Sequence, residues 1–180
     1  MSKLKNAVLG CFSAASAFFL AVPSVNAQNP PKLSDPEIAH VAVVANKIDI
    51  GYAEIALQKS KNAEVVNFAK TMSSDHQAVI NQAVALVTKL KVTPLDNGVS
   101  KKMMADAEKT KAMLHSKSGK AFDKAYIDNE VAYHKAVIAA VETVLIPQAQ
   151  NAELKELLQK VDPTLKAHLQ HAEMVQSNLK

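Results

Sequence analysis

The sequence predicts an all-α protein, and three observations support this prediction. Apolar residues recur at alternating spacings of three and four over long stretches, as they do on a helix that buries one face. The chain has only four glycines and seven prolines in 180 residues, too few for the many turns of a β-sandwich. No segment of useful length alternates apolar and polar residues in the way of a half-buried strand.

The first 27 residues have the pattern of a secretory signal. Lys3 and Lys5 precede an apolar stretch over 8–22, and Val25-Asn26-Ala27 forms a small-residue cleavage pattern. A membrane-spanning helix needs about 20 apolar residues, but Pro23 interrupts this stretch earlier. We therefore expect cleavage near Ala27 and a periplasmic or secreted mature protein.

The mature chain would carry little net charge and no cysteine. Cleavage after Ala27 removes Cys11, the single cysteine. Attachment of a lipid at Cys11 is disfavoured, because the apolar stretch of the signal follows Cys11 and should precede it. All 21 cationic residues are lysines, and 19 remain against 17 acidic residues. This balance, without arginine, predicts no nucleic-acid partner. No later apolar run approaches the length of an integral membrane segment.

One helical domain is predicted over 35–180, after a linker over 28–34 that contains two prolines. The first helix is expected over 36–59. Its start allows two registers, with Ser34 as N-cap and Glu37 completing a capping box, or Asp35 as N-cap followed by Pro36. The apolar positions of its expected core face are Ile38, Val41, Ala45, Ile48, Tyr52 and Ile55.

Four more helices follow along the chain. The second starts after Asn62 and ends before Pro94; a shorter third covers 99–117. The fourth follows Gly119 and is expected to end at Pro147. The fifth begins near Asn151, and Pro163 inside it is expected to kink or split it. Four long helices, with the short helix in the crossover between the second and third of them, predict a ferritin-like four-helix bundle.

Each long helix carries a polar residue that leans toward the predicted core. These residues are Asp49, His76, the pair Glu130 and His134, and His168. Imidazole and carboxylate groups together are typical ligands of Zn, Fe, Cu or Mn, so the sequence predicts a divalent transition-metal site. The alternative is a metal-free layer of hydrogen-bonded histidines in a structural or stress-response interaction protein.

Nothing in the sequence assigns a catalytic residue. A di-iron centre of this fold needs Glu-x-x-His pairs on two helices. The chain has one such pair, Glu37 and His40, and capping explains Glu37 better. Asp75 and His76 are adjacent and point about 100° apart on a regular helix, so they cannot bind one ion together. Asp75 is expected to lie at the surface or to support a ligand from behind. His171 is expected to be exposed. The sequence identifies no protein partner and does not decide the oligomeric state, although a homo-oligomer is possible.

Several segments resemble one bacterial family. They are FAKTMSSDH (68–76), FDKAYIDNEVAYH (122–134), DPTLKAHLQHA (162–172) and, in the first helix, IDIGYAEIAL (48–57). Over 35–176 the chain resembles the family called domain of unknown function 4142. The resemblance implies a small exported protein of ferritin-like fold, without an established activity. It also implies that the motif histidines are His76, His134 and His168, and that Asp49 occupies the acidic position of the first helix.

Overall fold

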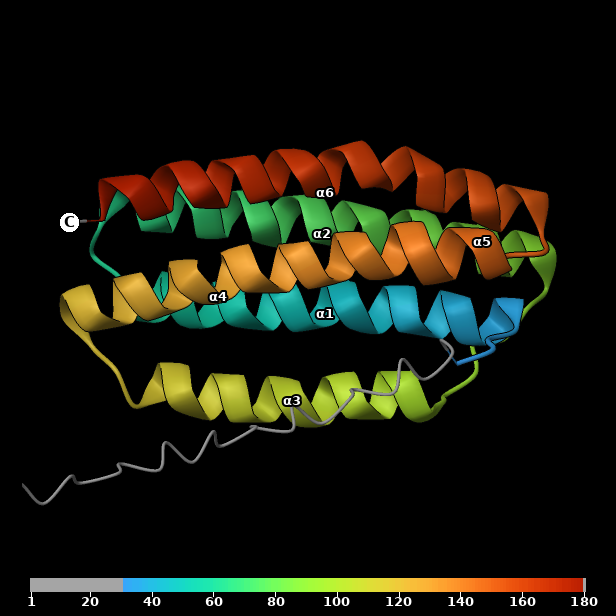
Figure 1. Ribbon diagram of the computed structural model, residues 1–180, viewed down its shortest axis with the longest axis horizontal. Helices are drawn as coiled ribbons and strands as arrows, with labels where there is room; N and C mark the ends of the chain where they lie inside the picture. The colour runs from blue at the N-terminus through green and yellow to red at the C-terminus, as the bar shows by residue number, and fades with distance from the viewer. Residues whose placement is uncertain (1–30, 180) are drawn as a thin grey trace, which may run out of the picture.

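The computed structural model describes residues 31–179, and all of the regular structure in that range is helical (Figure 1). The predicted signal segment over 1–27 lies outside the described residues. The elements are α1 (Asp35–Lys59), α2 (Ala63–Leu90), α3 (Gly98–His115), α4 (Gly119–Ala140), the π-helical turn η1 (Val141–Leu145), α5 (Ile146–Gln148) and α6 (Ala152–Asn178). The prediction of an all-α fold is confirmed.

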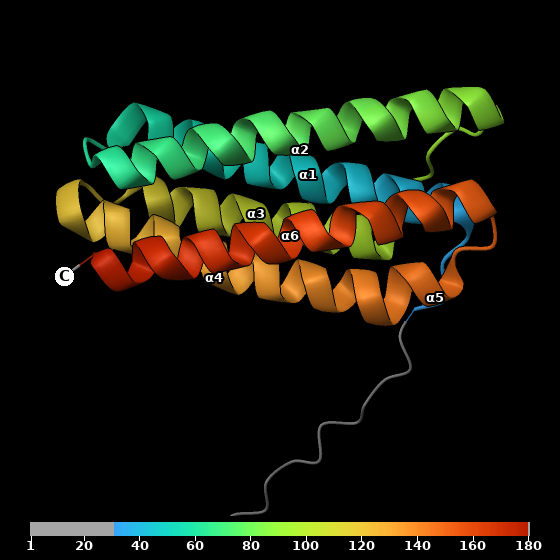
Figure 2. The ribbon, with the colours of Figure 1, turned by 90° about the horizontal axis from the view of Figure 1, so that it is seen from above.

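The helices α1, α2, α4 and α6 form the bundle, and α3 lies outside it (Figures 1 and 2). Helix α1 packs chiefly on α2, α4 packs chiefly on α6, and α3 packs on α1. Because α3 carries the chain back along the length of the molecule, α2 and α4 run in the same direction. This arrangement of four long helices with a shorter crossover helix is the one that the sequence predicts.

The start of α1 is defined by a capping box, which decides between the two predicted registers. The Glu37 carboxylate accepts hydrogen bonds from the Ser34 backbone N–H at 2.8 Å and from the Ser34 hydroxyl at 2.6 Å. Asp35 is therefore not the N-cap. Its carboxylate instead accepts from the backbone N–H groups of Gln150 and Asn151, each at 2.8 Å. These bonds fasten the start of α1 to the turn before α6.

Two apolar clusters fill the interior of the bundle. One contains the aromatic side chains Phe68, Phe122 and Tyr126. The other is aliphatic and lies toward the opposite end, where Ile38 and Leu158 are buried. On α4 and α6 His134 and His168 fall between the residues of the two clusters. All six apolar positions predicted for the core face of α1 are buried.

The two prolines of the last two predicted helices have different effects. The helical run that begins with α4 ends at Gln148, next to Pro147 as predicted, but it first widens into η1, where the Ile146 N–H donates to the Val141 carbonyl. A wider turn accommodates the proline ring, which clashes with a carbonyl four residues earlier in a regular helix. Helix α6 continues through Pro163, so of the two predicted effects, a kink or a split, the split does not occur. Leu165, buried in the core, holds the second half of α6 on the bundle.

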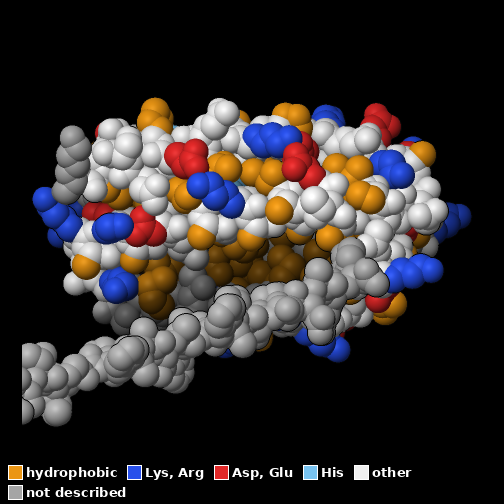
Figure 3. All heavy atoms as spheres, in the orientation of Figure 1, with side chains coloured by type: hydrophobic (Ala, Val, Ile, Leu, Met, Phe, Trp, Pro, Cys, Tyr) orange, Lys and Arg blue, Asp and Glu red, His pale blue; other side chains and the backbone are white. Residues whose placement is uncertain are grey.

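The visible surface mixes both signs of charge. In Figure 3 lysine and acidic side chains alternate across the upper face, and hydrophobic side chains line a hollow below them. None of the helices over 31–179 combines the length and apolar character needed to cross a bilayer.

The continuous path of α6 predicts that Pro163 destabilises the fold. Pro163 is exposed and lacks the N–H that would bond within the helix. Replacing Pro163 with Ala should raise the free energy of unfolding by about 1–3 kcal/mol. Urea denaturation measures the change, and Pro36→Ala is the control because Pro36 lies in the first turn of α1, where no N–H partner is lost. Unchanged or lower stability of Pro163→Ala would contradict the prediction.

Candidate metal centre

The structure brings all five predicted site residues into one buried layer. Asp49 comes from α1, His76 from α2, Glu130 and His134 from α4, and His168 from α6. Each side chain belongs to a residue that is at most 5% exposed. All four helices of the bundle therefore contribute to the layer.

The three imidazole rings of this layer face one another. Their centroids lie 5.1 Å apart for His76 and His168, 5.5 Å for His134 and His168, and 5.7 Å for His76 and His134. One nitrogen from each ring lies within 4.8 Å of the corresponding nitrogens of the other two. The spacing is small enough for three rings to share one ion after modest adjustment.

Asp49 adds an oxygen to this group. Its Oδ2 lies 3.3 Å from Nε2 of His76 and 3.6 Å from Nε2 of His134. Two ligands at about 2.0 Å from a tetrahedral zinc ion lie about 3.3 Å apart. The separations between Asp49 and the two histidines are therefore close to those of ligands on a common ion.

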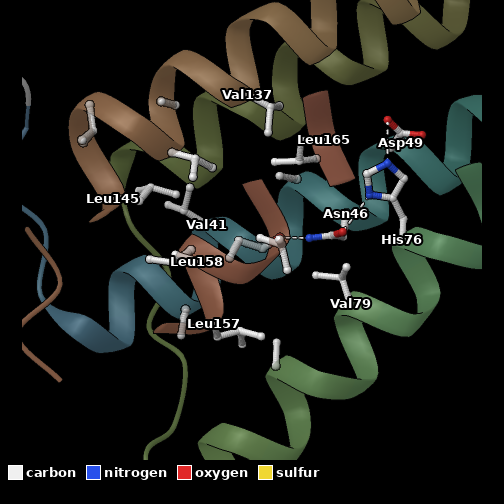
Figure 4. Close-up of a pocket in the computed structure, with 18 of the residues that line it drawn as sticks. Val41, Asn46, Asp49, His76, Val79, Val137, Leu145, Leu157, Leu158 and Leu165 are labelled. Carbon is white, nitrogen blue, oxygen red and sulfur yellow. Dashed lines mark hydrogen bonds and ion pairs between the residues drawn. The ribbon is translucent and has the colours of Figure 1, made fainter. Parts of the chain in front are cut away.

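Asn46 orients the His76 ring. Its Nδ2 donates to the Ala42 carbonyl at 2.8 Å, which turns its Oδ1 toward Nδ1 of His76 at 2.7 Å (Figure 4). An amide oxygen only accepts hydrogen bonds, so the proton of neutral His76 lies on Nδ1. The lone pair of Nε2 then points toward Asp49. The sequence reasoning missed Asn46, although it precedes Asp49 by three positions, close to one helix face.

The other two histidines are oriented in the same manner. Nδ1 of His134 lies 2.9 Å from the Glu130 carbonyl oxygen, and Nε2 of His168 lies 3.0 Å from a carboxylate oxygen of Asp75. Both oxygens accept, so these nitrogens carry the protons. Nε2 of His134 and Nδ1 of His168 are buried without a hydrogen-bond partner, as is Nε2 of His76. Asp75 thus has the supporting position that the sequence suggested.

Glu130 lies behind His134. Its Oε2 is 3.6 Å from Nδ1 of His134, the nitrogen that already contacts the Glu130 carbonyl oxygen. Glu130, Asp49 and His134 form a second group of potential ligands that overlaps the three histidines. Both carboxylate oxygens of Glu130 are buried without a hydrogen-bond partner.

Burial disfavours the charged form of every group in the layer. It lowers the pKa of His76 to about 3 and that of His134 to about 4, and it also lowers the pKa of His168. It raises the pKa of Asp49 and of Glu130, and the nearby Asp49 charge raises that of Glu130 further. Neutral imidazole is the form that binds metals, and a cation would displace the carboxyl protons.

Two other predicted positions lie away from the layer. Glu37 caps α1, and Nδ1 of His40 lies 4.0 Å from Asp96, so this Glu-x-x-His pair belongs to the end of the bundle. The prediction that His171 is exposed is wrong. Its ring is half-buried, with its centroid 5.1 Å from that of Phe68, because this part of α6 packs close to α2.

Comparison with known proteins gives one match. The profile of the family described as Domain of unknown function (DUF4142) matches residues 20–175. Searches of curated proteins and of solved structures return no match.

The geometry predicts the protonation state and tautomer of each histidine in the metal-free protein. Because their pKa values are lowered, His76 and His134 should stay neutral at about pH 5.5, where an ordinary histidine is mostly charged. Imidazole ¹⁵N NMR should find protons on Nδ1 of both rings and on Nε2 of His168. The same rings in urea-unfolded protein are the control and should titrate together near the ordinary value. A charged His76 or the opposite tautomer would contradict the geometry.

Proposed function

The chain belongs to the DUF4142 family, and from its buried layer we propose that it is a helical-bundle protein that binds one divalent transition-metal ion. The family description assigns no activity, so the proposal rests on the site. One observation carries it: His76, His134 and His168, from three different helices, each offer a ring nitrogen within 4.8 Å of the others, and Oδ2 of Asp49 from the fourth helix lies 3.3 Å from Nε2 of His76. The ligands we assign are His76, His134, His168 and Asp49, with Glu130 beside them.

The hydrogen bonds around the layer support this proposal. A histidine that ligates a metal almost always donates its other N–H to an oxygen, which orients the ring and sets the tautomer. All three histidines have such a bond, to an amide, a backbone carbonyl and a carboxylate. A metal-free structural layer would gain from pairing the remaining nitrogens, because unpaired buried polar atoms destabilise a fold.

The chemistry of the ligands limits the choice of metal. Neutral nitrogen and carboxylate oxygen suit Zn, Fe, Mn and Cu(II), whereas Cu(I) prefers sulfur, which the layer does not offer. Three nitrogens and one oxygen leave room for a further ligand on ions that accept five. We propose binding rather than di-iron catalysis, because the Glu-x-x-His pair at Glu37 and His40 lies outside the layer.

We also propose that the protein is exported to the periplasm. The proposal rests on the positive start, apolar stretch and small-residue ending of residues 1–27. Expression of the full chain in a Gram-negative host, followed by mass spectrometry of the periplasmic fraction, tests it. We expect a protein that begins after Ala27; uncleaved protein retained in the cytoplasm would contradict the proposal.

Metal loading is the direct test of the proposed function. Protein purified without a His tag should bind one equivalent of Zn²⁺, measured by elemental analysis. At about 100 times the dissociation constant, zinc should raise the free energy of unfolding by about 2.7 kcal/mol, because it binds only the folded bundle. The double variant His76→Ala/His134→Ala should lose both effects.

The control for this test is His115→Ala, which removes an exposed histidine at the end of α3 and should leave zinc binding unchanged. Loading is repeated with Fe²⁺, Mn²⁺ and Cu²⁺. If none of the four ions binds, and none alters the melting temperature, the proposed function is wrong. Equal zinc loss in the His115→Ala variant would show binding outside the layer and would equally contradict the assignment.

A further inference from the structure

An apolar cavity of about 200 Å³ extends from the histidine layer into the aliphatic end of the bundle. Its walls come from all four bundle helices, with a contribution from α3. Figure 4 shows branched aliphatic side chains around it, among them Val41, Val79, Val137, Leu157, Leu158 and Leu165. The cavity extends beyond the proposed ligands, because most of its wall is apolar and can form neither hydrogen bonds nor metal bonds.

Polar groups gather at one end of this cavity. Asn46, Asp49, His76, His134 and His168 all contribute to the lining at that end, together with Tyr133. In Figure 4 Asn46, His76 and Asp49 lie on one side, and the leucines lie on the other. Glu130 is not part of the lining. A molecule in the cavity would therefore meet a long apolar wall and a single polar end.

The dimensions of the cavity suit a narrow chain. On α1 the lining runs from Ala39 to Asp49, which at 1.5 Å per residue is about 15 Å along the helix. On α2 it runs from His76 to Val87, a similar length. A dry apolar cavity of about 150 Å³ accommodates benzene, so this volume suits an apolar group of about six to ten carbon atoms.

The cavity reaches the face of the molecule on which α3 and α4 lie (Figure 1). The lining includes Val99 and Met103 of α3, Val137 of α4 and Val144 of η1, and all four side chains are half-buried. Figure 3 shows hydrophobic side chains at the floor of a hollow on this face. A ligand can therefore enter from the side of the bundle without separating α1 from α2, its most extensive helix pair.

We propose that this cavity binds one unbranched aliphatic chain of about six to ten carbons, with a terminal carboxylate at the histidine layer. The apolar wall favours a hydrocarbon chain, because such a ligand gains most of its binding energy by burying apolar surface. The polar end favours an oxygen ligand, which can occupy the remaining position on a metal held by His76, His134, His168 and Asp49. The bond between the carboxylate and the metal rests on the proposed function, whereas binding of the aliphatic chain in the cavity does not depend on a metal.

A series of fatty acids of different chain length tests whether the aliphatic chain binds in the cavity. Isothermal titration of the metal-free protein with hexanoate, octanoate, decanoate and tetradecanoate should show affinity rising about fourfold per methylene up to decanoate. Tetradecanoate should bind more weakly than decanoate, because the cavity is too short for it. Affinity that does not depend on chain length, or that keeps rising to tetradecanoate, would overturn the proposal.

Two matched variants locate the binding. Ala83 is buried and lines the cavity, so Ala83→Leu should fill part of it and weaken decanoate binding at least about tenfold. Ala85 is exposed on the same helix, and Ala85→Leu should bind decanoate like the original protein. Ala42→Leu fills the cavity from α1 and gives a second test if Ala83→Leu fails to fold. Unaltered decanoate binding in a folded, cavity-filled variant would overturn the assignment.

Metal loading separates this inference from the proposed function. With Zn²⁺ bound, decanoate should bind at least about tenfold more tightly than 1-decanol, and His76→Ala/His134→Ala should abolish that preference while keeping the chain-length dependence. If zinc does not bind but the chain-length series behaves as expected, the proposed function is wrong, while binding of the aliphatic chain in the cavity is supported. If zinc binds but decanoate does not, the metal site stands and this inference is overturned.

Discussion

Burial of two carboxyl groups and three imidazoles in one layer is the constraint on which the rest of the bundle depends. A charge on any of them would be costly in surroundings built from apolar side chains. The fold meets this constraint by shifting the pKa of each group toward its neutral form and by giving each imidazole one hydrogen-bond partner. The metal ion that we propose would let the Asp49 carboxylate ionise and would bond to the remaining nitrogens.

The layer also divides the bundle into two different halves. On one side Phe68, Phe122 and Tyr126 pack closely with small residues of α1. On the other side the aliphatic wall leaves a cavity of about 200 Å³. The aromatic half can hold the four helices in register while the hollow half stays free to admit a ligand, so both proposals concern one connected space.

Much of the fold follows from local patterns that a reader can find in the printed sequence. The spacing from Ile38 to Ile55 predicts the buried face of α1, and a capping signal at Ser34 marks its start. Pro163 does not split α6, because packing of the flanking leucines outweighs the local preference of one proline. The π-turn before Pro147 was not expected either, since a proline in sequence indicates disruption but not its form.

By itself the sequence determined the helices, their buried faces and the polar residues on those faces, since helical periodicity is a local property of the chain. It also singled out Asp49, His76, Glu130, His134 and His168, because isolated polar residues on apolar stripes need an explanation. Only the tertiary structure decided that these residues meet in one layer and that a cavity adjoins them. It also decided which imidazole nitrogens have no hydrogen-bond partner. Those features depend on how helices far apart in the chain are placed against one another, to within about 1 Å, and no spacing along one helix contains that information.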